Sequence, residues 1–292
     1  MTKSMNIRGS VRSTVMQAFA LEGVGLHSGQ PSSVFVTPGS AGIRVADGDA
    51  FHVVSSLEVA RTPRCTRLVL PSGRQIDMVE HLFAALRIAG ITDADIVFIG
   101  DEVPVLDGSS SPWLRAFSSA GTRPVTGSAD CLVVTAPVEL VAGQSRFRVT
   151  PGAFEVTCTI DFPNPHIGHQ KITVAESDLF ELANARTFAM EHEIEMLKAH
   201  NLALGGSLDN AVVVGDRGPL NPEGFRMPDE CVRHKTLDFI GDLMVLGVPV
   251  IGRFEIHAPG HAANNAFVEA IVASGHLRRV SVVVGDQFLL AA

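Results

Sequence analysis

The chain presents strand-forming and helix-forming segments in the same order twice. Short β-prone runs across residues 11–69 precede an amphipathic stretch at residues 76–89, and runs across residues 131–161 again precede helical stretches, one of them an apolar-rich stretch at residues 189–206. Strands grouped before helices favour layered α+β units over an alternating βαβ sheet. We therefore predict an α+β fold with two packed layers, although the residues themselves show no convincing repeat.

Length and composition favour two domains. With 292 residues and a hydrophobic content of 46%, the chain can bury two cores. A segment rich in Gly, Thr, Ser and Pro at residues 121–130 predicts the boundary between them. We place an N-terminal domain at residues 1–126 and a C-terminal domain at residues 127–292.

Charge and cysteine usage exclude several classes of protein. The formal net charge is −8, from 23 basic and 31 acidic residues without a basic block, which argues against nucleic acid or an anionic membrane surface as partner. The first ten residues lack the apolar core of a signal peptide, and no run approaches ~20 apolar residues. Four widely spaced cysteines form no paired motif. We expect a cytoplasmic protein with reduced thiols and no integral membrane association.

One expected helix carries a polar stripe through an apolar segment. His234, Asp238 and Asp242 recur every four residues, so they fall on one helix face. Residues 227–230 offer a start for this helix and residues 246–247 a stop. The stripe can hold a metal ion. The alternative is a half-exposed helix in which His234 and Asp238 only hydrogen-bond each other.

A second polar pair, Glu80 and His81, lies in the expected helix at residues 76–89. Their side chains point about a quarter-turn apart, so one can bind a metal while the other faces a water molecule. In the alternative, a capping box that begins at Asp77, Glu80 would only satisfy helix amides. His81 has apolar neighbours and therefore needs a polar partner. With His234 and Asp238 it would complete a two-histidine, one-carboxylate set that suits catalytic Zn²⁺.

His261 follows an expected strand and opens the last expected helix. A nearby carboxylate such as Asp242 would favour the imidazolium, which could then act as a general acid or stabilise an oxyanion. The alternative is a cap-region histidine that faces water. Thr187 interrupts a helical region, and its hydroxyl is a candidate neutral donor.

Seven motifs in a fixed order resemble one known family. They lie at residues 23–29, 79–82, 104–109, 185–188, 204–207, 232–242 and 260–261. Over nearly its whole length the chain is similar to the UDP-3-O-acyl-N-acetylglucosamine deacetylases, the zinc enzymes of lipid A biosynthesis. The resemblance implies a two-domain sandwich, in which each domain is a helical layer packed on a mainly antiparallel sheet and the active site lies between the domains.

The resemblance also implies the roles of the polar residues. His81, His234 and Asp238 would bind Zn²⁺. Glu80 would take a proton from the attacking water, and His261 would protonate the leaving amine.

Further residues gain supporting roles from the same resemblance. Thr187 would help to stabilise the oxyanion, and Asp242 would orient His261. Residues 189–204 correspond to the acyl-chain passage of the family. The substrate implied is an acylated UDP-sugar, and we expect a monomer. The residues placed at this substrate are Leu26, Phe162, Phe188 and Lys235.

Ala258 departs from the family pattern, which commonly has a lysine here, suited to a substrate phosphate. Two other functions therefore stay open. One is a divergent paralogue that deacetylates another N-acetylated sugar or an acylated glucosamine, and the other is a non-catalytic sugar- or lipid-binding descendant. Glu80, Asp242 and His261 together argue against the second, because binding alone has no use for a base and an acid.

Overall fold

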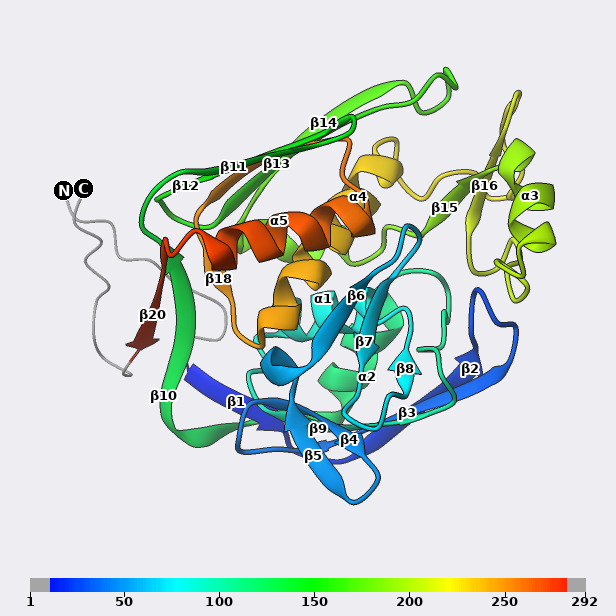
Figure 1. Ribbon diagram of the computed structural model, residues 1–292. Coiled ribbons are helices and arrows are strands. Elements are labelled where there is room, and N and C mark those ends of the chain that lie inside the picture. The colour runs from blue at the N-terminus through cyan, green and yellow to red at the C-terminus, as the bar shows by residue number, and fades with distance from the viewer. Residues whose placement is uncertain (1–10, 283–292) are drawn as a thin grey trace.

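Two five-stranded sheets form the outer layers of the molecule, and helices lie between them (Figure 1). The computed structural model describes residues 11–282. The arrangement confirms the predicted α+β fold, because the strands of each half gather in their own sheet instead of alternating with helices.

The first sheet shows the alternation expected of strands with one buried face. In its second strand Val34 and Val36 are buried whereas Phe35 is exposed, which places the core on the helix side. The sheet has the order β2-β3-β9-β4-β5, and only β9 and β4 are parallel. Its strands are β2 (Phe19–Val24), β3 (Pro31–Pro38), β4 (Ile43–Asp47), β5 (Ala50–Val53) and β9 (Ala94–Ile99).

The second sheet repeats the topology of the first. In each sheet, the strand that comes last in the sequence is inserted between the second and the third strand of that sheet. This strand is parallel to the third strand, and the other neighbours in the sheet are antiparallel. The repeated order of element types in the sequence is therefore a repeat of topology. The strands, in the order β11-β12-β19-β13-β14, are β11 (Val138–Ala142), β12 (Ser145–Thr150), β13 (Glu155–Asp161), β14 (His169–Ala175) and β19 (Arg253–His257).

Each half also carries an insert between its fourth sheet strand and its first long helix. The first insert is a three-stranded sheet, and the second combines three strands with a short helix at the right of Figure 1. The first consists of β6 (Glu58–Arg61), β7 (Thr66–Val69) and β8 (Gln75–Ile76). The second consists of β15 (Phe188–Met190), α3 (Ile194–Ala199), β16 (Val212–Gly215) and β17 (Gly218–Pro219).

One long strand, β10 (Thr122–Val134), runs from the first half into the second. β1 (Val11–Val15) pairs with its beginning, whereas β18 (Val250–Ile251) and β20 (Leu277–Val282) pair with its end. Residues 122–130, at the predicted boundary, therefore form a paired strand and not a loop, because pairing on both sides overrides the local turn propensity. The two-domain division stays a prediction, which we retain as a proposal because each half builds its own sheet.

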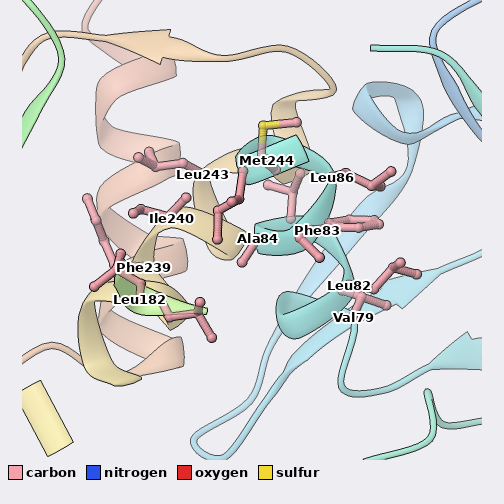
Figure 2. Close-up of a cluster of buried hydrophobic side chains, with 14 of the residues drawn as sticks. Val79, Leu82, Phe83, Ala84, Leu86, Leu182, Phe239, Ile240, Leu243 and Met244 are labelled. Carbon is pink, nitrogen blue, oxygen red and sulfur yellow. The ribbon is translucent and has the colours of Figure 1, made fainter. Parts of the chain in front are cut away.

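Two central helices, one from each half, pack directly on each other. Apolar side chains of α1 (Glu80–Ala89) and α4 (Glu230–Leu243) form one buried cluster (Figure 2). Gly241 lets the two backbones meet, because a Cβ atom there would lie 2.1 Å from the carbonyl oxygen of Glu80. The flanking helices are α2 (Ser111–Ala120), which packs on α1, and α5 (His261–Ala273), which packs on α4.

The first long helix begins later than the sequence predicts. Residues 75 and 76 form β8, and Met78 has a left-handed φ of 64°, so the helix starts only at Glu80. The capping-box alternative for Glu80 is wrong. Arg67 binds the carboxylate of Asp77, and Glu80 accepts a hydrogen bond from the Thr66 amide at 2.9 Å instead.

The helical stretch expected at residues 189–206 is mostly not helical. Its first residues pair with β16 as a strand, and only Ile194–Ala199 forms an α-helix. Left-handed φ values at Asn201 (56°) and Ala203 (54°) end the helix and turn the chain back. Among residues 11–282, no helix combines the length and the apolar character that crossing a bilayer requires.

The contact at Gly241 predicts an unusually costly substitution. Gly241→Ala is expected to lower the free energy of unfolding by at least about 1–3 kcal/mol, as overpacking does, because a helix backbone must shift. Gly260→Ala is the control, since a Cβ atom there meets nothing within 4 Å. Denaturant unfolding of both variants measures the difference. Equal stability of the two would show that α1 and α4 can separate freely.

Candidate metal and catalytic site

The helix α4 presents two of the predicted ligands on one face, as their spacing requires. His234 Nε2 lies 3.1 Å from Asp238 Oδ1, and both side chains are buried. His234 Nδ1 lies 3.1 Å from the carbonyl oxygen of Ala185, which can only accept, so this nitrogen carries the proton. The Nε2 lone pair therefore points at the carboxylate.

This geometry indicates a cation site. Burial lowers the pKa of His234 to about 3, so the ring is neutral and two lone-pair atoms face each other. Asp238 Oδ1 is buried and has no hydrogen-bond partner among residues 11–282. Buried polar atoms are rarely left without a partner. A metal ion between His234 and Asp238 would satisfy both atoms.

The helix α1 brings the third member of this group from the other half of the chain. His81 Nε2 lies 3.6 Å from Asp238 Oδ1, and its ring meets that of His234 edge-on with centroids 5.0 Å apart. One ligand atom from each of these three residues lies within 4.8 Å of the others. Two imidazoles and one carboxylate thus converge, and these side chains could hold a metal ion.

Glu80 and His261 face each other beside this group. His261, the first residue of α5, directs Nε2 toward Glu80 Oε1 at 3.8 Å and toward Asp238 Oδ2 at 3.7 Å. Its Nδ1 lies 3.1 Å from Asp242 Oδ2. The alternative of a histidine that faces water is therefore wrong, because the ring is buried against three carboxylates.

The surroundings shift the pKa values of this pair in useful directions. Burial raises the pKa of Glu80 to about 7, against the pull of the nearby imidazoles. Burial by itself would lower the pKa of His261, but the carboxylates of Asp242, Glu80 and Asp238 raise it to about 9. Between these values the site holds a carboxylate that can accept a proton next to an imidazolium that can donate one.

A largely apolar cavity of about 410 Å³ opens beside the polar groups. Both inserts contribute to its wall, the first through Pro63 and Arg64 and the second through α3 and the loop that follows it. Arg64 bridges the inserts by an ion pair with Glu193 at 3.2 Å. The cavity wall therefore continues from the metal-binding group into an apolar passage.

Most of the remaining predicted site residues line this cavity. Leu26, Thr187, Phe188 and Lys235 all contribute to the wall, and Lys235 Nζ lies 3.2 Å from Asp238 Oδ2. Phe188 packs on the His234 ring, at a centroid distance of 6.3 Å. Phe162 does not line the cavity.

Phe162 instead contacts Phe188 edge-on, with ring centroids 5.4 Å apart.

Three other residues of the site were not predicted from the sequence. His27, in the Gly-rich segment at residues 23–29, lines the cavity, whereas Thr66 and Asn264 hold Asp242 by hydrogen bonds. The Gly-rich segment around His27 was a usable signal, but a single threonine or asparagine carries none.

A buried set of two imidazoles and a carboxylate, with a separate acid–base pair at the end of an apolar cavity, is typical of metal-dependent hydrolases. Residues 12–273 match the model of the UDP-3-O-acyl N-acetylglycosamine deacetylase family. The chain belongs to this family of deacetylases.

Curated relatives agree over most of their length. The chain is 41% identical to the UDP-3-O-acyl-N-acetylglucosamine deacetylase of Phenylobacterium zucineum (strain HLK1), over 94% of this chain and 97% of that protein. It is 38% identical to the enzyme of that name from Neisseria gonorrhoeae (strain ATCC 700825 / FA 1090), over 89% of each chain. The enzyme of that name from Syntrophotalea carbinolica (strain DSM 2380 / NBRC 103641 / GraBd1) is 40% identical, over 90% of this chain and 88% of its own.

The contact between Asp242 and His261 predicts a shifted titration. In metal-free protein, the His261 imidazolium should lose its proton only near pH 9, because the carboxylates stabilise the positive charge. Asp242→Asn should move the midpoint to lower pH, since it removes the chief favourable charge. Imidazole NMR signals measure the midpoint, with Asp47→Asn as a remote control. A wild-type midpoint near 6.5, or one unmoved by Asp242→Asn, would contradict this prediction.

Proposed function

We propose that the chain is a zinc-dependent deacetylase of UDP-3-O-acyl-N-acetylglucosamine, which releases acetate and the free amine in an early committed step of lipid A biosynthesis. The observation that carries this proposal is the buried pair of facing lone pairs at His234 and Asp238, next to Glu80 and His261. The names of the relatives supply the substrate.

His81, His234 and Asp238 would hold the zinc ion, whose preference for nitrogen and oxygen ligands this set fits. When bound, zinc supplies Lewis-acid chemistry, polarising the acetamide carbonyl and lowering the pKa of a water molecule. The neutral His234 ring, fixed by Ala185, has its Nε2 ready to coordinate without losing a proton.

The residues of the chain move two protons. Glu80 accepts a proton from the water molecule while the water oxygen forms a bond to the acetamide carbon. The carbon–nitrogen bond then breaks, and His261 gives its proton to the leaving nitrogen. Thr187 and the His261 imidazolium would stabilise the negative oxygen between these steps. The raised pKa values of Glu80 and His261 suit these directions of transfer.

The cavity would hold the acyl chain, and the charged end of the substrate would lie near Lys235. An apolar chain gains free energy by leaving water for a wall built from residues such as Ile194, Leu197 and Val213. We assign Leu26, Phe188 and Phe162 to substrate binding as well, with Phe162 acting through its contact with Phe188.

We further propose a cytoplasmic monomer. All four cysteines are buried free thiols, and burial raises the pKa of Cys131 to about 11, which leaves it unreactive. Reduced thiols of this kind suit a reducing compartment. The proposed ligands, base and acid all come from one chain, so a monomer would suffice.

Replacing the proposed base, Glu80, tests the reaction directly. Glu80→Ala should lower acetate release by at least about 100-fold, because no other group receives the proton, while zinc stays bound through His81, His234 and Asp238. Acetate release and metal content are measured on the same preparation, and Glu80→Gln serves as the variant of equal shape. Near-normal turnover in either variant would contradict the proposed mechanism.

The same assay separates the alternative functions. Ala258 offers no charge to a diphosphate, which leaves hydrolysis of a nucleotide-free acylated sugar as the second candidate. Equal turnover of the nucleotide-linked and nucleotide-free substrates would favour that candidate. Absence of acetate release from every N-acetylglucosamine derivative, with zinc-loaded protein, would favour a binding protein.

The cavity predicts a test of the acyl site. Leu208 lines the cavity and is 38% exposed, so Leu208→Asp places a charge beside the chain without burying it in the core. KM for a long-chain substrate should rise at least about tenfold, because desolvating a carboxylate is costly. Met196→Asp is the control, since Met196 is 48% exposed and does not line the cavity. Equal KM values for both variants would place the acyl chain elsewhere.

A further inference from the structure

Thr66, the first residue of β7, contacts all three helices that carry the candidate catalytic groups. Its amide donates a hydrogen bond to Glu80 Oε2 of α1 at 2.9 Å, and its hydroxyl donates to Asp242 Oδ1 of α4 at 2.5 Å. The same hydroxyl accepts a bond from Asn265 Nδ2 of α5 at 3.2 Å. The side chain is fully buried, so no solvent competes for these bonds.

The hydroxyl of Thr66 determines how Asp242 is held. Asp242 Oδ1 accepts the Thr66 bond, whereas Oδ2 accepts a bond from Asn264 Nδ2 at 2.8 Å and lies closer to His261 Nδ1 (3.1 Å) than Oδ1 does (3.4 Å). A buried carboxylate must satisfy both oxygens, and its rotation is fixed by its donors. The hydroxyl thus turns Oδ2 toward the histidine.

The main chain of Thr66 holds the other partner. Its amide engages Glu80 Oε2, which leaves Oε1 to face His261 Nε2 at 3.8 Å. Its carbonyl accepts a bond from the Val79 amide at 3.4 Å, directly before α1 begins. One residue therefore fixes the carboxylate on one side of His261 and the carboxylate on the other.

Threonine is suited to this position for a specific reason. A β-branched residue in a strand has restricted χ1 freedom, so its hydroxyl keeps one direction. Valine has nearly the same shape but cannot donate to Asp242. Serine retains the donor, although with a freer side chain.

We propose that Thr66 is a positioning residue that sets the distance between Glu80 and His261, holding Asp242 through its hydroxyl and Glu80 through its amide. The inference rests on the proposed function, in which Glu80 is the base and His261 the acid. Thr66 itself touches neither the reacting atoms nor the metal-binding group.

The first experiment compares Thr66→Val with Thr66→Ser in the full-length zinc-loaded protein. Thr66→Val should lower kcat for acetate release by about 10–100-fold with little change in KM, because misplaced groups slow the chemical step more than they weaken binding. Thr66→Ser should retain kcat within about threefold. Thr14→Val is the control, since Thr14 is equally buried and its hydroxyl accepts a bond from the Gly39 amide, away from the site.

The second experiment is a double-mutant cycle with Asp242→Asn. If the hydroxyl acts through Asp242, the double variant should have a kcat less than about threefold below that of Asp242→Asn alone. A structural role would instead show as lowered thermal stability with equal losses in both backgrounds. Zinc content of each variant is measured in parallel and should not change.

Several results would overturn the inference. These are a kcat for Thr66→Val close to the wild-type value, a Thr66→Ser variant as impaired as Thr66→Val, or an undiminished loss in the Asp242→Asn background. Thr66→Ala takes the place of Thr66→Val if the latter does not fold. Absence of acetate release by the wild-type protein would overturn the proposed function as well, whereas an active wild type with an unaffected Thr66→Val overturns this inference alone.

Discussion

The contact between α1 and α4 at Gly241 determines where every polar group of the site can lie. A side chain at this position would collide with the backbone of Glu80, so the two helices are close only because a glycine stands there. The candidate ligands come from both helices. His81 follows directly after that contact, and Asp238 lies one turn before it on the other helix. A separation of even one or two ångströms between the helices would divide the ligand set.

The cavity beside the site depends on a second close approach, between two glycine-rich loops. The amides of Leu204 and Gly205 donate hydrogen bonds to the carbonyls of His27 and Leu26. A Cβ atom on Gly205 would lie 2.2 Å from the Gly25 carbonyl oxygen, so the backbones touch without intervening side chains. The insert of the second half is thereby fixed to the first half. The motifs at residues 23–29 and 204–207 therefore both contribute to this one contact.

Local spacing explains which features could be predicted from the sequence. His234, Asp238 and Asp242 share a helix face by periodicity alone, and the structure places them on one face of α4. The pairing of Asp242 with His261 was also expected on chemical grounds. The role of Glu80 was harder to predict, because the sequence also allows Asp77 to cap the helix. In the structure the Asp77 carboxylate is bound instead by Arg67, from a neighbouring strand.

Features set by distant contacts could not be predicted. Thr66 lies 176 positions from its partner Asp242, and nothing near it in the chain indicates the bond. The first part of β10 could not be predicted as a strand, because its Gly, Ser and Thr residues favour turns unless strands such as β1 and β20 pair with them. The helix expected at residues 189–206 was shortened by pairing between β15 and β16. In each case a tertiary partner outweighed local propensity.

Strand β10 has a consequence for how a substrate reaches the site. Its first part is hydrogen-bonded to β1 of the first half, and its last part is hydrogen-bonded to β18 and β20 of the second half. Opening one half against the other would therefore have to bend this shared strand. The inserts can separate at lower cost, because the Arg64–Glu193 ion pair that joins them is partly exposed and inexpensive to break. In the deacetylation proposed above, the rate at which the long-chain product leaves would accordingly depend on the inserts.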